Sequence, residues 1–156
     1  MVTAVQHNVG LGQIQVARND EMLTSILGSC IGVVIYDQSR RIAAFAHVVL
    51  PTSGGRPGSP GRFADSAVPA MLQQLRNEGA NPQQLRAKIT GGACMFGNSQ
   101  INIGERNAEE VRRQLKEKKI PLIAEDVGGA KGRKVHFSPQ TSQLEVVVMG
   151  VTSTII

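Results

Sequence analysis

Two neighbouring apolar segments constrain the fold of this chain more than any other feature of its sequence. Residues 31–36 are rich in β-branched side chains, and residues 42–50 form a second apolar stretch. The residues that separate them, Asp37-Gln38-Ser39-Arg40, are typical of a turn. The pattern therefore predicts a β-hairpin of buried strands, around which the rest of the chain has to pack.

Shorter periodic segments surround this hairpin. Further strands are predicted near residues 14–16, 22–27, 87–90, 120–124, 134–137 and 144–149. Helical spacing predicts two helices, one from a cap at Asp65 or Ser66 to Gly79, and one over about residues 105–119 with Asn107 and Glu110 as a capping pair. Because the strands come in blocks, we expect an α+β fold with mixed β-sheets of about seven strands packed against two main helices.

Length and composition favour a single domain over residues 1–156. Of the 156 residues, 41% are hydrophobic, which is enough to form a core without disulfide bonds. No apolar run approaches the ~18 residues of a membrane span, and the N-terminus lacks the pattern of a signal peptide. Two cysteines, Cys30 and Cys94, are too few for a disulfide framework. We therefore expect a cytoplasmic protein with reduced thiols that is not inserted in a membrane.

Charge and histidine spacing argue against two further classes of function. The net charge is +5 and most of the excess lies in the second half, but aromatic residues make up only 3% of the chain. Without aromatic side chains between the basic ones, a nucleic-acid surface is not favoured. His7, His47 and His136 are far apart, and no pair of cysteines has metal-ligand spacing. We expect neither a nucleic-acid partner nor a bound metal.

A cysteine and a histidine offer the most promising chemistry. Cys30 follows Leu27-Gly28-Ser29, where an extended segment has to turn, and His47 lies on the partner strand of the predicted hairpin. If residues 22–30 stay extended, Thr24 and Cys30 face the same side, so that the Thr24 hydroxyl orients the imidazole. The alternative from these residues alone, a buried inert thiol and a buried structural histidine, stays open.

Four ordered motifs resemble one known family. They are Thr24-Ser25-Ile26-Leu27-Gly28-Ser29-Cys30-Ile31-Gly32-Val33 with Ala46-His47-Val48-Val49-Leu50-Pro51; Lys88-Ile89-Thr90-Gly91-Gly92-Ala93-Cys94-Met95-Phe96; Asn102-Ile103-Gly104-Glu105-Arg106-Asn107; and Ala124-Glu125-Asp126-Val127-Gly128-Gly129. Together they resemble the CheD family of chemoreceptor glutamine deamidases over nearly the whole chain. The family often has a serine at the position of Cys94, and we interpret the second thiol as a neutral replacement.

The resemblance implies an enzyme, a protein-glutamine glutaminase. Its catalytic residues would be Cys30 as nucleophile, His47 as acid and base, and Thr24. It would convert glutamine side chains of chemoreceptor cytoplasmic helices to glutamate through a thioester, releasing ammonia and requiring no cofactor. Receptor methylesterase activity stays open. In the alternative reading, the chain acts chiefly as a binding partner of a CheC-type chemotaxis phosphatase.

One loop is placed to serve such a site. Residues 51–61 are rich in glycine and proline and begin four residues after His47. A surface loop so near the histidine predicts a role in binding the receptor helix, with a passive connector as the alternative.

Overall fold

The expected hairpin forms the centre of a five-stranded sheet. The computed structural model describes residues 5–94, 102–148 and 152–156. Strands β4 (Ile31–Asp37) and β5 (Ile42–Val48) pair antiparallel, with Ile31 opposite Val48. Every residue of both strands is buried, because other layers cover both faces of this sheet.

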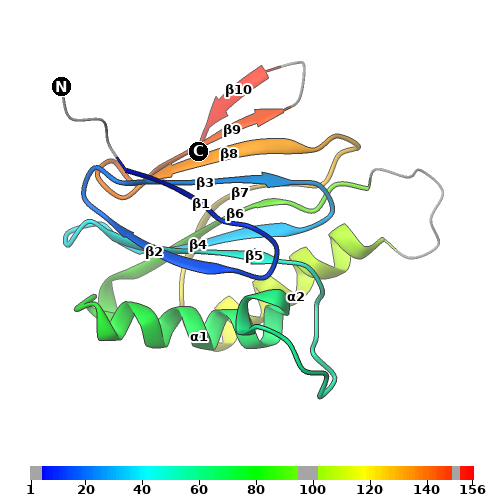
Figure 1. Cartoon of the computed structure of the whole chain (residues 1–156), viewed down its shortest axis with the longest axis horizontal. Coiled ribbons are helices and arrows are strands. Elements are labelled where there is room, and N and C mark those ends of the chain that lie inside the picture. Colours follow the sequence, from blue (N-terminus) through cyan, green and yellow to red (C-terminus); the bar gives the residue numbers. More distant parts are fainter. Residues whose placement is uncertain (1–4, 95–101, 149–151) are drawn as a thin grey trace.

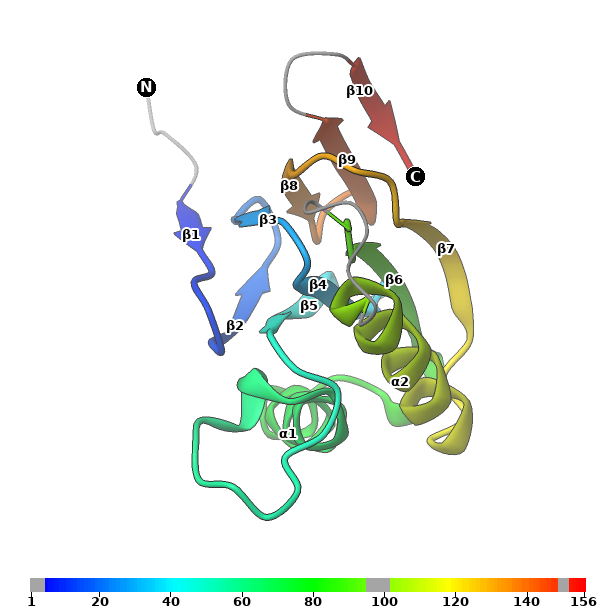
Figure 2. The same ribbon diagram turned by 90° about the vertical axis from the view of Figure 1, so that its right-hand side faces the viewer.

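Two β-sheets stack above a layer of two helices (Figure 1). In one sheet the order is β1-β3-β8-β9-β10, comprising β1 (Gln6–Asn8), β3 (Met22–Leu27), β8 (Arg133–Ser138), β9 (Gln143–Val148) and β10 (Thr152–Ile155). In the other the order is β2-β5-β4-β6-β7, adding β2 (Ile14–Arg18), β6 (Leu85–Gly91) and β7 (Leu122–Val127). Viewed from the side, the sheets and helices form three layers (Figure 2).

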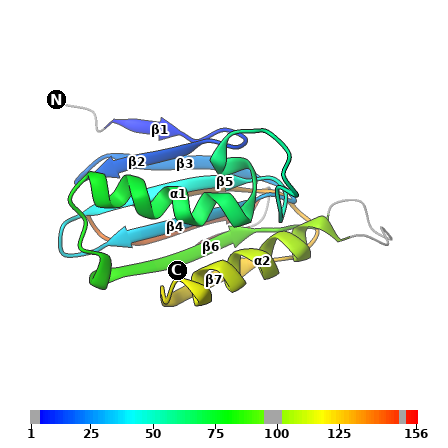
Figure 3. The same ribbon diagram turned by 90° about the horizontal axis from the view of Figure 1, so that it is seen from below.

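Each interface between layers has its own apolar core. Leu23 and Leu27 of β3 pack with Val34 and Phe45 between the two sheets. On its other face the β4–β5 sheet packs against α1 (Ala64–Asn77) and α2 (Ile103–Glu117), which lie side by side (Figure 3). The helices therefore cover one face of one sheet only.

Both predicted helices exist, but both predicted caps are wrong. The first helix begins at Ala64 after Phe63, with no side-chain cap. Asp65 instead accepts the backbone N–H of Ser53. The second begins two residues earlier than expected, because Asn102 caps it by accepting the N–H of Glu105 at 3.0 Å.

The α+β class is confirmed, with more strands than expected. The described residues form ten strands rather than about seven. Strands β1 and β10 have 3 and 4 residues, too few for a periodic apolar pattern. Met95 and Phe96, which belong to one of the motifs, lie outside the described residues.

Candidate functional site

The Cys30 thiol lies in the bend that joins β3 to β4. Two backbone hydrogen bonds tie this bend to the end of β6: the Ala93 N–H donates to the Gly28 carbonyl at 3.0 Å, and the Gly92 N–H donates to the Cys30 carbonyl at 2.9 Å. Cys30 belongs to the apolar core between the sheets and is only 9% exposed. The turn of small residues that the sequence predicts here is therefore present, and these two hydrogen bonds hold it against β6.

His47 lies one strand away, opposite Gly32 of β4. Its Nδ1 atom is 3.1 Å from the Val9 carbonyl and 2.9 Å from the Ser25 hydroxyl, which itself donates to the same carbonyl at 2.6 Å. Because a carbonyl can only accept, Nδ1 carries the proton of the neutral ring. The lone pair of the imidazole is therefore on Nε2, the atom that a general base needs.

The fold brings Cys30 and His47 to the same end of the β4–β5 hairpin, within the layer between the sheets. Burial raises the pKa of the Cys30 thiol. Burial also lowers the pKa of His47, an effect partly opposed by the Val9 carbonyl. A raised thiol pKa and a lowered imidazole pKa both favour the uncharged forms, which makes the resting pair a neutral thiol and a neutral imidazole.

Thr24 does not contact the imidazole, and the expected geometry is wrong. The Thr24 hydroxyl donates to the His7 carbonyl at 3.5 Å, and the hydroxyl beside His47 belongs to Ser25. The expectation assumed an extended chain up to residue 30, but β3 ends at Leu27. Leu23, Ser25 and Leu27 face the inner layer, so alternation turns Thr24 to the other face.

Sequence reasoning also missed Asn107, which it assigned to a helix cap. Asn107 is fully buried within α2, and its amide Nδ2 donates to the carbonyls of Ser29 and Val49, at 3.2 Å and 3.0 Å. An asparagine on the apolar face of a predicted helix was the available signal, because buried amides need partners.

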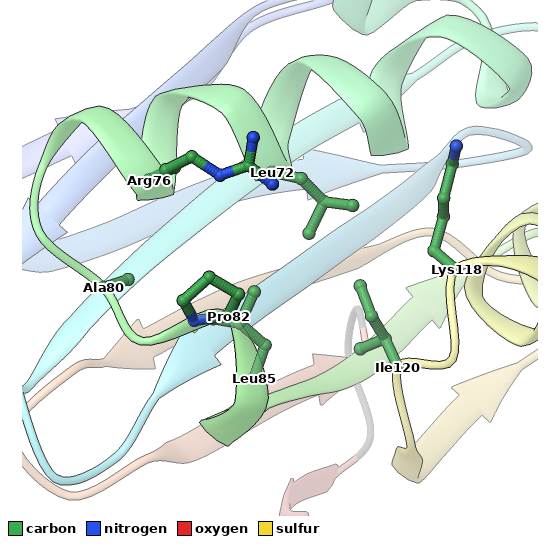
Figure 4. A pocket seen from close by; sticks show the side chains of 7 residues that line it. All are labelled: Leu72, Arg76, Ala80, Pro82, Leu85, Lys118 and Ile120. Carbon is green, nitrogen blue, oxygen red and sulfur yellow. The ribbon is translucent and has the colours of Figure 1, made fainter.

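Three other features of the described chain bear on where chemistry could take place: metal-binding clusters, membrane-spanning helices and pockets. Within the described segments, no three His, Cys, Asp or Glu side chains lie close enough to hold a metal ion, and no helix could cross a membrane. A pocket of about 230 Å³ lies between the C-terminal ends of α1 and α2 (Figure 4). Its residue Leu85 pairs with Asp37, at the end of β4 opposite Cys30.

Comparisons with known proteins point to one family. The family model described as CheD chemotactic sensory transduction matches residues 49–148, an interval that begins just after His47. The chain is 41% identical over 143 residues to "Chemoreceptor glutamine deamidase CheD" of Thermotoga maritima, covering 91% of each chain. It is 41% identical over 155 residues to the "Probable chemoreceptor glutamine deamidase CheD" of Geobacillus kaustophilus, covering 94% of each. Among solved structures, the hypothetical protein YfiH of Bacillus licheniformis matches 72% of this chain and 49% of its own, with a TM-score of 0.48 and 18% identity.

Proposed function

Because the chain belongs to the CheD family, we propose that it is an amidohydrolase that converts glutamine side chains of chemoreceptors to glutamate. One observation carries the proposal most strongly. At the end of the β4–β5 hairpin that also carries the buried Cys30, His47 is held through Nδ1, which leaves Nε2 as the basic atom. A cysteine nucleophile needs an acid–base partner whose ring is oriented in this way.

In the proposed reaction, Cys30 Sγ attacks the side-chain carbonyl carbon while the thiol proton passes to Nε2 of His47. His47 then protonates the amide nitrogen, the C–N bond breaks, ammonia leaves and a thioester remains. Next, Nε2 accepts a proton from water as the water oxygen attacks the thioester. The C–S bond breaks, the proton returns to sulfur, and glutamate is the product.

The resting protonation states suit this sequence of steps. A neutral imidazole can accept the thiol proton, and the same proton is later needed by the departing nitrogen. Catalytic hydrogen bonds often shorten only when substrate binds, so a longer separation of thiol and ring before binding is compatible with this role.

Burial of the pair favours a long, narrow substrate side chain. Cys30 is 9% exposed and His47 is 4% exposed, so the reacting carbonyl has to be carried inward from the surface. A glutamine side chain is long and unbranched, which suits such an approach from a receptor helix. Receptor helices are accordingly the proposed macromolecular partner, and the exposed loop after β5 is the segment we propose to contact them.

In this proposal Thr24 is a positioning residue through its backbone and not through its hydroxyl. Its carbonyl accepts the Val9 N–H at 2.8 Å, and the Val9 carbonyl in turn contacts His47. Thr24 would therefore act on the imidazole through β1 and the residue that follows it, rather than by direct contact.

Ammonia release tests the proposed activity. Purified protein is incubated with a receptor cytoplasmic fragment, and ammonia is measured over time alongside a Cys30→Ala variant. Release by the parent protein alone supports the proposal, and equal release by both would contradict it.

A further inference from the structure

One buried amide connects the two segments that carry the proposed catalytic pair. Asn107 donates both hydrogens of its Nδ2 group, one to the Ser29 carbonyl and one to the Val49 carbonyl. Ser29 immediately precedes Cys30, and Val49 comes two residues after His47. A single side chain on α2 therefore binds the bend just before β4 and the residue just after β5.

The helix that carries this amide is itself closely fixed to the site. Gly104, one turn before Asn107, lies so near the end of β6 that a Cβ atom at this position would collide with the Gly92 carbonyl. Gly92 also donates to the Cys30 carbonyl at 2.9 Å. The close packing of Gly104 on Gly92 therefore holds α2, and with it the Asn107 amide, in a fixed position relative to Cys30.

The hydrogen bond to Ser29 also sets the direction of the next N–H. In a trans peptide the carbonyl and the following N–H point in opposite directions. Because the Ser29 carbonyl points to Asn107, the Cys30 N–H points away from α2. Among the described residues, no backbone carbonyl accepts from this N–H. In the proposed reaction it would donate to the oxyanion that forms when Cys30 attacks an amide.

The amide oxygen of Asn107 indicates that its Nδ2 group, and not its oxygen, accounts for an asparagine at this position. Asn107 Oδ1 is buried and has no hydrogen-bond partner among the described residues. A buried acceptor without a partner is destabilising. An amide at this position is therefore better explained by its two donated hydrogen bonds than by packing.

We propose that Asn107 is a positioning residue of the deamidase site, which fixes the Ser29–Cys30 peptide relative to the strand that carries His47. This inference rests on the proposed function for its kinetic consequence. The effect of Asn107 on how strongly His47 influences the Cys30 thiol does not depend on the substrate.

The test compares Asn107→Ala with Gln114→Ala. Gln114 is also a buried amide on α2, but the described hydrogen bond of its Nε2 stays within the helix, to Glu110. For Asn107→Ala we expect kcat on a receptor fragment to fall about tenfold or more with little change in KM, because small displacements of reacting groups are costly. Gln114→Ala should keep its kcat, whatever its melting temperature. An unchanged kcat for Asn107→Ala, or an equal loss in both variants, would overturn the inference.

A second measurement needs no receptor. The rate of Cys30 alkylation by iodoacetamide is measured with and without His47→Ala, in the parent and in the Asn107→Ala background. We expect the effect of His47→Ala to be largest in the parent and to shrink when Asn107 is absent. An equal effect in both backgrounds, including none in either, would contradict the positioning role.

If the parent releases no ammonia but this coupling is found, the proposed function fails while the inference about Asn107 stands. Where Asn107→Ala does not fold, Asn107→Ser, which keeps one donor, is measured in its place.

Discussion

The Ser25 hydroxyl lies 2.9 Å from Nδ1 of His47, on the side of the ring opposite the atom that would exchange a proton with Cys30. The same hydroxyl donates to the Val9 carbonyl, so that three groups form one buried cluster. Ser25 is only 1% exposed, which keeps water from replacing it. The orientation of the imidazole therefore depends on β3 and on the residue after β1.

This cluster predicts that Ser25→Ala lowers kcat with little effect on KM. One hydrogen bond of this kind contributes about 0.5–1.5 kcal/mol, which corresponds to a rate loss of roughly two- to tenfold. Thr24→Val, which removes a hydroxyl without changing the side chain's shape, is the matched control. It should lose less activity, because the described hydrogen bond of the Thr24 hydroxyl goes to the His7 carbonyl and not to the imidazole. A larger loss in Thr24→Val than in Ser25→Ala would show that this assignment is wrong.

Alkylation should inactivate the protein through Cys30 rather than Cys94. Burial raises the pKa of the Cys30 thiol, so its thiolate fraction at neutral pH is below that of an ordinary cysteine. We expect its iodoacetamide rate to keep rising as the pH increases above neutrality, and the loss of activity to follow the Cys30 adduct. Peptide mapping at several pH values measures both. Activity loss that follows the Cys94 adduct would contradict the choice of nucleophile.

Acid should destabilise the fold through His47. Burial lowers the pKa of this histidine in the folded state, so the unfolded chain takes up a proton first as the pH falls. The contribution of His47 to stability is complete above the pKa of an unfolded histidine. It is lost progressively as the pH falls from that value towards the lower pKa of His47 in the folded state. Melting temperatures across this range should fall for the parent and depend less on pH in His47→Gln. Parallel curves for the two proteins would contradict the prediction.

The loop after β5 should distinguish a receptor from a small substrate. Its last residues are fixed near the site: the Ser59 hydroxyl donates to the Gly12 carbonyl at 2.7 Å, and the Gly12 N–H donates to the His47 carbonyl at 2.9 Å. Residues 54–58 are exposed. Shortening this part while keeping Ser59 should lower activity on the receptor and spare a small glutamine peptide.

Two other results of the loop experiment have different meanings. Full activity on both substrates would show that the loop is a passive connector. Equal loss on both would show that the deletion had displaced His47, and would count against a recognition role.

The hairpin, and with it the placement of Cys30 and His47 at one end of the sheet, could be predicted because both depend on local patterns. Apolar residues and a polar turn determine which strands pair, and the pairing brings the two residues to one end of the sheet. The partner of the imidazole could not be predicted in this way. Which residues of β3 face inward depends on how the strand packs on the next sheet, and one residue of difference exchanges Thr24 for Ser25.

The two helix starts show the same limit. Phe63 precedes the first helix without a capping side chain, so packing rather than a local signal determines where that helix begins. Asn107 has the residue type of a cap but lies within the second helix, where tertiary contacts use its amide. Local propensity describes such residues poorly when their partners are far away in the sequence.

Site-resolved mass spectrometry of a receptor fragment shows whether this protein deamidates glutamine through Cys30. The fragment is incubated with the parent protein, with Cys30→Ala and with buffer alone, and each glutamine is examined for conversion to glutamate. Cys30→Ala also tests the alternative reading, because a variant that still binds a partner separates binding from catalysis. We expect conversion at specific glutamines with the parent protein only. Conversion by Cys30→Ala at the parent's rate, or none by the parent above buffer, would contradict it.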